Sequence, residues 1–335
     1  MAGSLMKAVV CDQYEPLEQL CVRDTRVPQL DEQSVRIQTR YASLNGPDLL
    51  MPLGLYQVKP ELPFVLGLEA MGIVAECGAS VTDLRPGDRV MAYVGQGCFA
   101  EQIVAPRHTL ARVPAGMDDP GAAGFILVYS TAYHALVDCG QVQAGDKVLI
   151  SGASGGIGIA AIQIAKAKGA TVIAMAGTPE KMEACRAEGA DVVLDSNVED
   201  LTHAIRDVAG RQGVNVVLDI VGGEFTEQAL RAIAPNGRHL ITGYASGNVP
   251  LIKGNLVLLK RAQVIGVSYR QLLASTPAAA ARNLEELCRM FEAGHLRPRT
   301  CAVYPLDRIG QALIHVRERR VVGKVAIAIT PDAGS

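Results

Sequence analysis

Hydrophobic and polar residues follow one pattern before Pro120 and another after it. Between residue 6 and about residue 109, short apolar or alternating runs are interrupted by proline and glycine, which is typical of β-strands joined by turns. The predicted strands are 7–10, 35–41, 72–76 and 89–93. The segment 45–56 between two of these strands is polar first and apolar later. A long irregular segment of this kind inside a compact domain is often functional.

After Pro120 the pattern predicts a helix at 122–136 and then strands that alternate with helices. Short apolar runs indicate buried strands, and the longer segments between them have a helical period. The predicted strands are 148–151, 171–175, 192–194, 214–220, 238–242 and 263–267, and the predicted helices are 179–188, 200–210 and 224–234. This alternation predicts an α/β domain with a doubly wound, parallel, six-stranded sheet.

The C-terminal part of the chain returns to a different pattern. It contains an amphipathic helix at 278–293, a short helix at 306–316 and a last strand at 324–329. We therefore expect three parts: a β-rich domain that begins at 1–122, an α/β domain at 123–270, and the remainder of the first domain at 271–335. A domain inserted into another leaves a cleft in which such proteins bind ligands.

One stretch carries a recognisable chemistry. An apolar strand ends in a glycine-rich turn, and a helix of small residues follows the turn. The residues of this turn are Ala153, Ser154, Gly155, Gly156, Ile157 and Gly158. The amides at the start of the helix and the positive end of its dipole favour an anion, and the glycines let a pyrophosphate approach the backbone. We predict a dinucleotide site; the alternative is a tight turn that packs well and binds nothing.

The end of the second strand of the α/β domain indicates which dinucleotide binds. Proteins of this type that take NAD usually hold the ribose 2′-hydroxyl with an acidic residue here. This chain has Gly177 and Thr178 instead, and Lys181 lies one turn into the next helix, where it can offer a cation to a phosphate. Thr178 can also cap that helix. We predict NADPH rather than NADH; the alternative for Lys181 is a solvated surface lysine.

Composition excludes several classes of function. The 32 Lys and Arg residues against 34 Asp and Glu residues give a net charge of −2, which provides no basis for a nucleic-acid or membrane partner. The eight cysteines contain no C-x-x-C pair, which favours reduced thiols in the cytoplasm. We see neither a basic and apolar leader nor an uncharged apolar run of membrane-spanning length. We expect a soluble cytoplasmic protein.

Several ordered motifs resemble those of one superfamily. They include Ser43–Asp48, Leu62–Glu69, Arg85–Val90, Gly152–Gly158, Asp219–Gly223 and Asn255–Lys260. Together they make the chain similar to the medium-chain dehydrogenases/reductases, in the zinc-free quinone oxidoreductase (zeta-crystallin-like) family. The resemblance implies a Rossmann domain inserted in a β-rich, GroES-like catalytic domain.

The resemblance also indicates whether the chain has residues that could bind zinc. Zinc-dependent relatives use Cys, His and Cys as catalytic ligands, and the corresponding positions here hold Asn45, Leu68 and Leu127, which are poor zinc ligands. The four-cysteine lobe of those relatives is missing as well, since Cys98 stands alone in its region. We expect no metal. Hydride delivery to a quinone or an electron-poor alkene does not need the Lewis acid that alcohol oxidation uses.

The resemblance assigns roles to five further positions. Tyr56 matches a tyrosine that related enoyl-thioester reductases keep beside the substrate, where its phenol can bond an enolate oxygen or supply a proton. Asn45 matches a polar residue near the nicotinamide, and Thr131 matches a threonine beside its ring. Gly243 and Tyr244 follow the fifth strand, where the family contacts the cofactor. Tyr56 has an alternative role as a packing residue at the rim of the cleft.

One departure and two alternatives accompany this hypothesis. NADPH-binding relatives often carry Asn-Tyr after the third strand, where this chain has Asp195-Ser196. The leading hypothesis is NADPH-dependent hydride transfer to a quinone or activated alkene. A 2-enoyl-thioester or enal reductase is the first alternative and would use exposed cations, for which the candidates are Arg270, Arg282, Arg297 and Arg299. A non-catalytic, crystallin-like nucleotide-binding protein is the second.

The family resemblance also implies an assembly. Strand 263–267 would pair with its own copy across a two-fold axis, because an uncovered apolar edge is an aggregation hazard. We therefore expect a homodimer.

Overall fold

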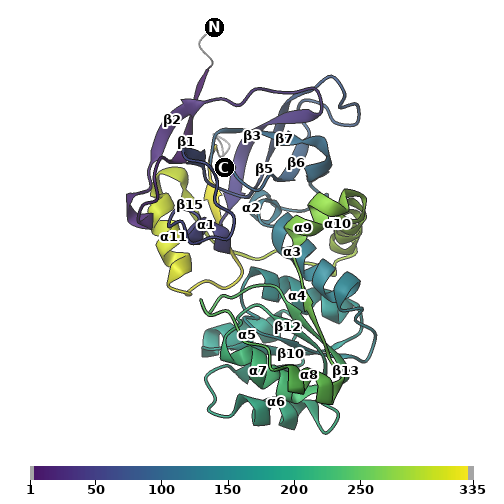
Figure 1. Cartoon of the computed structure of the whole chain (residues 1–335). Coiled ribbons are helices and arrows are strands. Elements are labelled where there is room, and N and C mark those ends of the chain that lie inside the picture. The colour runs from purple at the N-terminus through teal and green to yellow at the C-terminus, as the bar shows by residue number, and fades with distance from the viewer. Residues whose placement is uncertain (1–3, 331–335) are drawn as a thin grey trace. The chain divides into compact units, whose positions relative to one another are not determined.

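The computed structural model describes residues 4–330 and divides into two compact units (Figure 1). Residues 4–127 and 298–330 form the first unit, and residues 128–297 form the second. The expected boundary at 270/271 therefore lies inside the second unit. Helices α9 (Tyr269–Ser275) and α10 (Pro277–Glu292) belong to that unit, where Asn283 Nδ2 donates to Asp138 Oδ2 over 2.6 Å. Residues 1–3 and 331–335 of the expected catalytic domain lie outside the described residues.

A six-stranded parallel sheet forms the centre of the second unit. Its order is β11 (Val192–Asp195), β10 (Thr171–Ala176), β9 (Lys147–Ile150), β12 (Val214–Asp219), β13 (Ile233–Ile241) and β14 (Gln263–Gly266). The strand order reverses direction between β9 and β12, and the carboxyl ends of the strands meet there, which is where open α/β sheets bind ligands. The predicted doubly wound parallel sheet is confirmed.

The helices of the second unit follow the predicted alternation. They include α4 (Gly156–Ala167), α5 (Pro179–Ala187), α6 (Leu201–Ala209), α7 (Glu224–Ala232) and α8 (Gly254–Lys260). Asp200 begins α6 by accepting a bond from the His203 amide over 2.9 Å. Fully buried Ile173, Ile205 and Val217 pack between sheet and helices, which explains why the strands consist of uninterrupted apolar runs.

The single helix expected at 122–136 is wrong. The structure contains α2 (Asp119–Ala123), then α3 (Ile126–Tyr133), then a π-helical segment, His134–Cys139. Helix α2 ends at Gly124, which lies so close to β3 (Ser34–Ser43) that a Cβ on it would be 2.8 Å from Ser43 Oγ. Contact with the sheet therefore interrupts an otherwise continuous helical pattern.

The first unit is β-rich, as predicted. Its larger sheet has the order β15 (Thr300–Pro305), β16 (Lys324–Ala328), β3, β5 (Glu69–Cys77), β6 (Arg89–Tyr93) and β8 (Leu110–Arg112), and β7 (Gln102–Pro106) also pairs with β3. A smaller sheet joins β2 (Val22–Arg26), β1 (Leu5–Cys11) and β4 (Phe64–Val65). The strand after the inserted unit is central to this architecture, since Ala326 of β16 lies opposite Ser43 of β3.

Candidate functional site

The glycine-rich turn after β9 is shaped by close packing. Gly152 has a φ of +59°, a conformation that side chains rarely adopt. A Cβ on Gly158 would lie 2.5 Å from three backbone atoms of Ala153, so only glycine lets α4 approach the turn this closely. Ala153 is fully buried and its amide donates to the Met175 carbonyl of β10 over 3.1 Å. The turn is therefore fixed to β10.

The start of α4 fits a pyrophosphate. Gly155 is the N-cap, and no side chain caps this end of the helix. A Cβ on Gly155 would meet only the Gly152 oxygen, at 3.4 Å, so the space in front of the turn is open to a ligand. Gly156 and Ile157, the first helical residues, are half-buried. Amides at an uncapped helix start favour an anion, and a glycine there lets the anion approach closely.

The end of β10 is the second part of this site. Thr178 caps α5, accepting a bond from the Lys181 amide over 3.3 Å, and Lys181 is half-buried one turn into the helix. Asp195, the last residue of β11, lies opposite Ala176. Asn197 binds both strand ends: its Nδ2 donates to the Gly177 carbonyl and to Asp195 Oδ1, each over 2.9 Å.

The motifs gave no role to Asn197. Two features of the sequence could have revealed its importance: parallel pairing brings the ends of the second and third strands together, and Asn197 follows the third strand by two residues.

Asp219 organises the ends of β12 and β13. Its carboxylate is fully buried and accepts bonds from the Gly222 amide over 2.8 Å, from Thr226 Oγ1 over 2.5 Å and from His239 Nε2 over 3.0 Å. Its own carbonyl accepts the Thr242 amide over 2.9 Å. Burial opposes ionisation of Asp219, but these hydrogen bonds outweigh it and hold its pKa below the ordinary value.

The loop that contains Gly243 and Tyr244 is bonded to the loop after β12. The amides of Ala245 and Ser246 donate to the carbonyls of Ile220 and Val221, each over 3.0 Å. A Cβ on Gly222 would lie 2.9 Å from the Tyr244 ring. Both loops therefore form one backbone surface at the carboxyl edge of the sheet. Thr131, the remaining predicted residue of the second unit, is buried in α3 with 6 % of its surface exposed.

Asn45 belongs to a buried polar cluster in the first unit. Its Nδ2 donates to the Ser43 carbonyl over 3.1 Å and to Glu69 Oε1 over 3.0 Å, and its Oδ1 accepts from Lys324 Nζ over 2.5 Å. The backbone amide of Asn45 donates to Asp48 Oδ2 over 2.8 Å. The sequence motifs gave no role to Glu69 or Lys324.

The family resemblance matches Asn45, Leu68 and Leu127 to the zinc ligands of zinc-dependent relatives, and Asn45 contributes its side chain to this cluster. Leu68 precedes Glu69, and the Leu127 amide donates to Glu69 Oε2 over 2.9 Å. An amide and two leucine side chains do not fit zinc. Among residues 4–330, no group of three or more His, Cys, Asp or Glu side chains could hold a metal. Buried Cys98 has a thiol pKa well above its ordinary value, because burial disfavours the thiolate.

Tyr56 lies in the irregular segment after α1 (Gly46–Leu50). Its ring is half-buried and packs against the hydrophobic core of the first unit. Just before it, Gly54 has a φ of +66°, and a Cβ there would lie 3.2 Å from the Tyr14 ring. The surrounding segment exposes several large apolar side chains: Leu50, Leu53, Leu55, Val58 and Leu62. Tyr56 is thus a polar group within an apolar surface.

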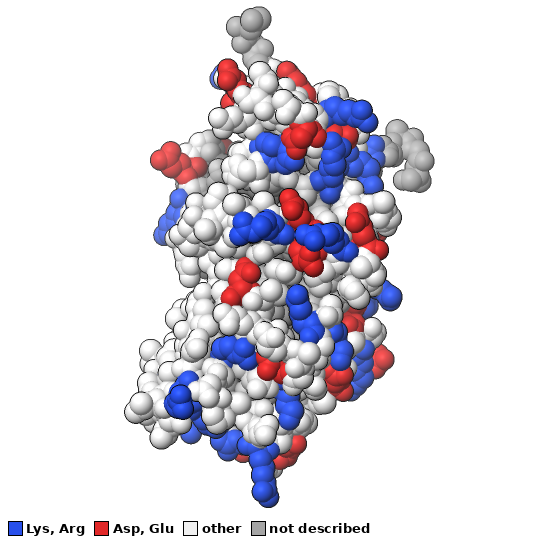
Figure 2. All heavy atoms as spheres, turned by 90° about the vertical axis from the view of Figure 1, so that its right-hand side faces the viewer, with Lys and Arg blue, Asp and Glu red and all other residues white. Residues whose placement is uncertain are grey.

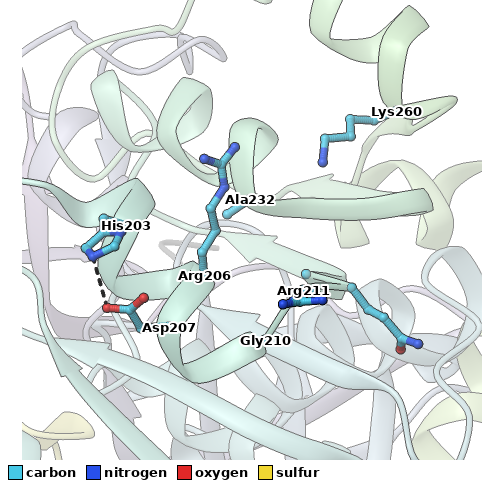
Figure 3. A pocket seen from close by; sticks show the side chains of 9 residues that line it. His203, Arg206, Asp207, Gly210, Arg211, Ala232 and Lys260 are labelled. Atoms are coloured by element: carbon cyan, nitrogen blue, oxygen red, sulfur yellow. Dashed lines mark ion pairs between the residues drawn. The ribbon is translucent and has the colours of Figure 1, made fainter.

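A surface hollow of about 430 Å³ lies at the opposite edge of the parallel sheet, before the start of β12. Figure 3 shows Arg206, Arg211 and Lys260 around it, with His203 paired to Asp207 over 3.3 Å. It contains none of the predicted site residues. On the face drawn in Figure 2, positive and negative side chains are intermixed, which gives no strong field of one sign there.

Among the described residues, none of the helices is both long and apolar enough to cross a bilayer. The two units match the family models of the alcohol dehydrogenase GroES-like domain, at residues 31–115, and of the zinc-binding dehydrogenase, at residues 156–286. This combination defines an oxidoreductase of the medium-chain dehydrogenase/reductase class.

Comparison with individual proteins identifies the branch of this class. The chain is 32 % identical to quinone oxidoreductase-like protein 2 of Rattus norvegicus, over 96 % of this chain and 92 % of that protein. It resembles Escherichia coli quinone oxidoreductase complexed with NADPH, with a TM-score of 0.90, 25 % identity and coverage of 96 % and 100 %. It also resembles CurK enoyl reductase, with a TM-score of 0.89, 25 % identity and coverage of 97 % and 99 %. The chain belongs to the quinone oxidoreductase family.

Proposed function

We propose that this protein uses NADPH to reduce a quinone or an activated alkene. The observation that carries the proposal is the uncapped start of α4, with open space in front of Gly155. This geometry suits a pyrophosphate, and the related Escherichia coli quinone oxidoreductase was crystallised with NADPH. When bound, the cofactor supplies a hydride from its nicotinamide.

The preference for NADPH over NADH is supported by the end of β10. Thr178 and Lys181 are the residues that would hold the 2′-phosphate, one through a hydroxyl and the other through a cation. The Asp195 carboxylate beside this strand end accepts two N–H groups of Asn197, over 2.9 Å each, which reduces its repulsion of a phosphate.

The roles at the substrate follow from Tyr56 and its surroundings. The apolar side chains near Tyr56 suit a flat apolar acceptor, and the phenol can donate to the oxygen on which negative charge develops. The ligand positions of zinc-dependent relatives hold Asn45, Leu68 and Leu127, so stabilisation of that oxygen falls to Tyr56. Thr131, Gly243 and Tyr244 are the proposed contacts of the nicotinamide half of the cofactor.

Oxidation of NADPH in the presence of a chelator tests the proposal. A quinone, an enal and a 2-enoyl thioester are compared with wild-type protein and with Tyr56→Phe. We expect turnover of the quinone or the enal by the wild type and a large loss of kcat in the variant. Tight NADPH binding without turnover of any acceptor would favour the crystallin-like alternative, and zinc-dependent alcohol oxidation would contradict the proposal.

A 2-enoyl-thioester reductase is the second candidate, favoured by the similarity to CurK enoyl reductase. A thioester substrate with an anionic carrier would need a cationic surface. The four candidate arginines are all exposed. Arg270 lies in α9, Arg282 in α10, and Arg297 and Arg299 in the segment that follows α10. Faster turnover of a coenzyme A thioester than of the matching simple thioester would support this candidate.

We also propose that the protein is a homodimer. Within residues 4–330, β14 pairs only with β13, so its outer edge can accept a second copy. The segment before it exposes Val249, Leu251, Leu258 and Leu259, each more than two-thirds accessible. Apolar exposure of this extent favours an interface. Light scattering should give a dimer mass, and Leu258→Asp should give a monomer.

The eight cysteines are all unpaired, at positions 11, 21, 77, 98, 139, 185, 288 and 301. Free thiols support the proposed cytoplasmic location.

A further inference from the structure

The ammonium of Lys324 has the contacts of a coordinated cation. Its Nζ donates to the Leu44 carbonyl over 2.7 Å and to Asn45 Oδ1 over 2.5 Å, and it lies 3.3 Å from Glu69 Oε1. These three oxygens match the three N–H donors of an ammonium. The residue is buried, with 8 % of its surface exposed, so water competes little for these bonds.

The three acceptors come from two segments of the chain, and Lys324 comes from a third, 279 residues after Asn45. Leu44 and Asn45 follow β3, Glu69 begins β5, and Lys324 begins β16. The second oxygen of Glu69 holds the Leu127 amide at the start of α3. Lys324 therefore binds the segment after β3 and the start of β5 directly, and it is linked to the start of α3 through Glu69.

The contacts of Lys324 with Asn45 and Glu69 suggest what the ammonium does. Asn45 binds the ammonium directly, and Glu69 joins the Asn45 amide, the ammonium and the Leu127 backbone amide. We propose that the Lys324 ammonium is an internal cation that fixes the orientation of the Asn45 amide.

The proposal changes the role of Asn45. Because Oδ1 faces the ammonium, both Nδ2 hydrogens are directed to Ser43 and Glu69. Asn45 is thus a positioning residue, which holds the start of α1 and the segment that leads to Tyr56. The ammonium of Lys324 donates to Leu44 and Asn45 and is paired with Glu69, so Lys324 acts through its neighbours rather than on a substrate.

The buried carboxylate of Glu69 favours an ammonium beside it. Glu69 is 1 % exposed, and Asp48 is fully buried. Burial lowers the pKa of Lys324, whereas the charges of Glu69 and Asp48 oppose that effect. An unpaired buried carboxylate is strongly destabilising, so removing the cation alone should cost far more than removing the pair.

Chemical rescue tests the proposal. Lys324→Ala leaves a channel that n-propylammonium fills atom for atom, and n-propanol is the uncharged control. We expect the variant to lose roughly 6–20 °C in melting temperature. Propylammonium, and not propanol, should restore most of it. Lys147→Ala is the matched control, because its ammonium makes a hydrogen bond to the Ala209 carbonyl in the second unit, and propylammonium should not restore it.

A double variant keeps the test informative if Lys324→Ala fails to fold. Lys324→Met should be less stable than Lys324→Met with Glu69→Gln, because the second change removes the unpaired carboxylate. Equal rescue by propanol, a wild-type melting temperature in Lys324→Ala, or a double variant no more stable than the single one would each overturn the proposal. One zinc per chain in purified wild-type protein, lost in Asn45→Ala, would also overturn it.

The role of Asn45 and Tyr56 in catalysis rests on the proposed function, whereas the melting temperatures do not. With a quinone as acceptor, Lys324→Met should lose roughly 10- to 100-fold in kcat, because small displacements of catalytic groups have large effects. Its Kd for NADPH should remain unchanged, since that site belongs to the second unit. Rescue of stability without any quinone turnover in the wild type would support the internal cation and contradict only the proposed reaction.

Discussion

Gly158→Ala tests whether the turn before α4 is shaped by packing. The added Cβ would lie 2.5 Å from the Cα, carbonyl carbon and oxygen of Ala153. Carbon atoms in contact prefer about 3.5–4.0 Å, so either the helix or the turn must move by about 1 Å. Ala153 cannot move freely, because it is fully buried and its amide is bonded to Met175 of β10.

The magnitude follows from two opposing effects. Overpacking against backbone costs about 3 kcal/mol, and alanine has an advantage over glycine inside a helix of about 1 kcal/mol. We expect a net loss of about 2 kcal/mol, or roughly 4–8 °C in the melting temperature of a unit of this size. Displacing the first amides of α4 should also weaken NADPH binding at least tenfold, which corresponds to about 1.4 kcal/mol.

Gly155→Ala is the matched control. Its backbone, with φ −81° and ψ 175°, suits alanine, and the new Cβ would meet only the Gly152 oxygen at 3.4 Å. We expect a wild-type melting temperature but weaker NADPH binding, because the methyl group fills the space in front of the turn. Calorimetry and fluorescence titration of NADPH separate the two effects. Wild-type stability of Gly158→Ala would refute the packing argument, and wild-type NADPH affinity of Gly155→Ala would refute the pyrophosphate site.

Three further changes test other parts of the proposal. Tyr56→Phe should lower kcat roughly 100-fold and leave the Kd for NADPH unchanged, because the variant loses a donor to a charged oxygen. An equal weakening of turnover and of NADPH binding would indicate a structural role. Lys181→Met should raise the Kd for NADPH about fivefold and leave that for NADH unchanged; an equal change in both would contradict a 2′-phosphate contact. Burial raises the pKa of Asp48 to about 7, above the ordinary value near 3.9. Between these two pH values the folded state binds more protons than the unfolded state, so stability should fall as pH rises from about 4 to 7. Asp48→Asn should flatten this part of the stability profile measured by urea unfolding, and an unchanged slope would contradict the assignment.

Much of the fold could be predicted because its signals are local. The change in period near Pro120 separated the β-rich region from the alternating one, and six short apolar runs matched the six strands of the parallel sheet. Boundaries were less accurate where tertiary contact overrides the local pattern. Strand β13, for example, begins at Ile233, five residues before the predicted start, because Ile233 already pairs with Val214.

Two elements that the sequence pattern did not predict, β15 and α8, have weak or ambiguous patterns. Strand β15 (Thr300–Pro305) contains Pro305 and alternates between half-buried and exposed residues, so its pairing with β16 decides its conformation. Helix α8 has only seven residues, of which Leu258 and Leu259 are exposed, and it lacks an amphipathic period.

The candidate site likewise has one part that the sequence predicts and one part that it does not. The turn before α4 could be predicted because neighbouring residues in the sequence form it. The cluster of Lys324, Glu69 and Asn45 could not, since Lys324 is 279 residues from Asn45 and only the pairing of β16 with β3 brings them together. A lysine within a short apolar strand at the end of the chain was the available signal, because an ammonium in such a strand must find buried acceptors.

The central position of β16 has a consequence for biosynthesis. A ribosome delivers the chain from its amino end, so β3 is made long before β16, and the whole second unit is made between them. Until β16 is made, residues 41–43 of β3 lack their partner on one side, and the carboxylate of Glu69 lacks Lys324. The second unit contains all six of its strands by residue 266 and can fold first. The sheet of the first unit is therefore completed only after β16 has been made.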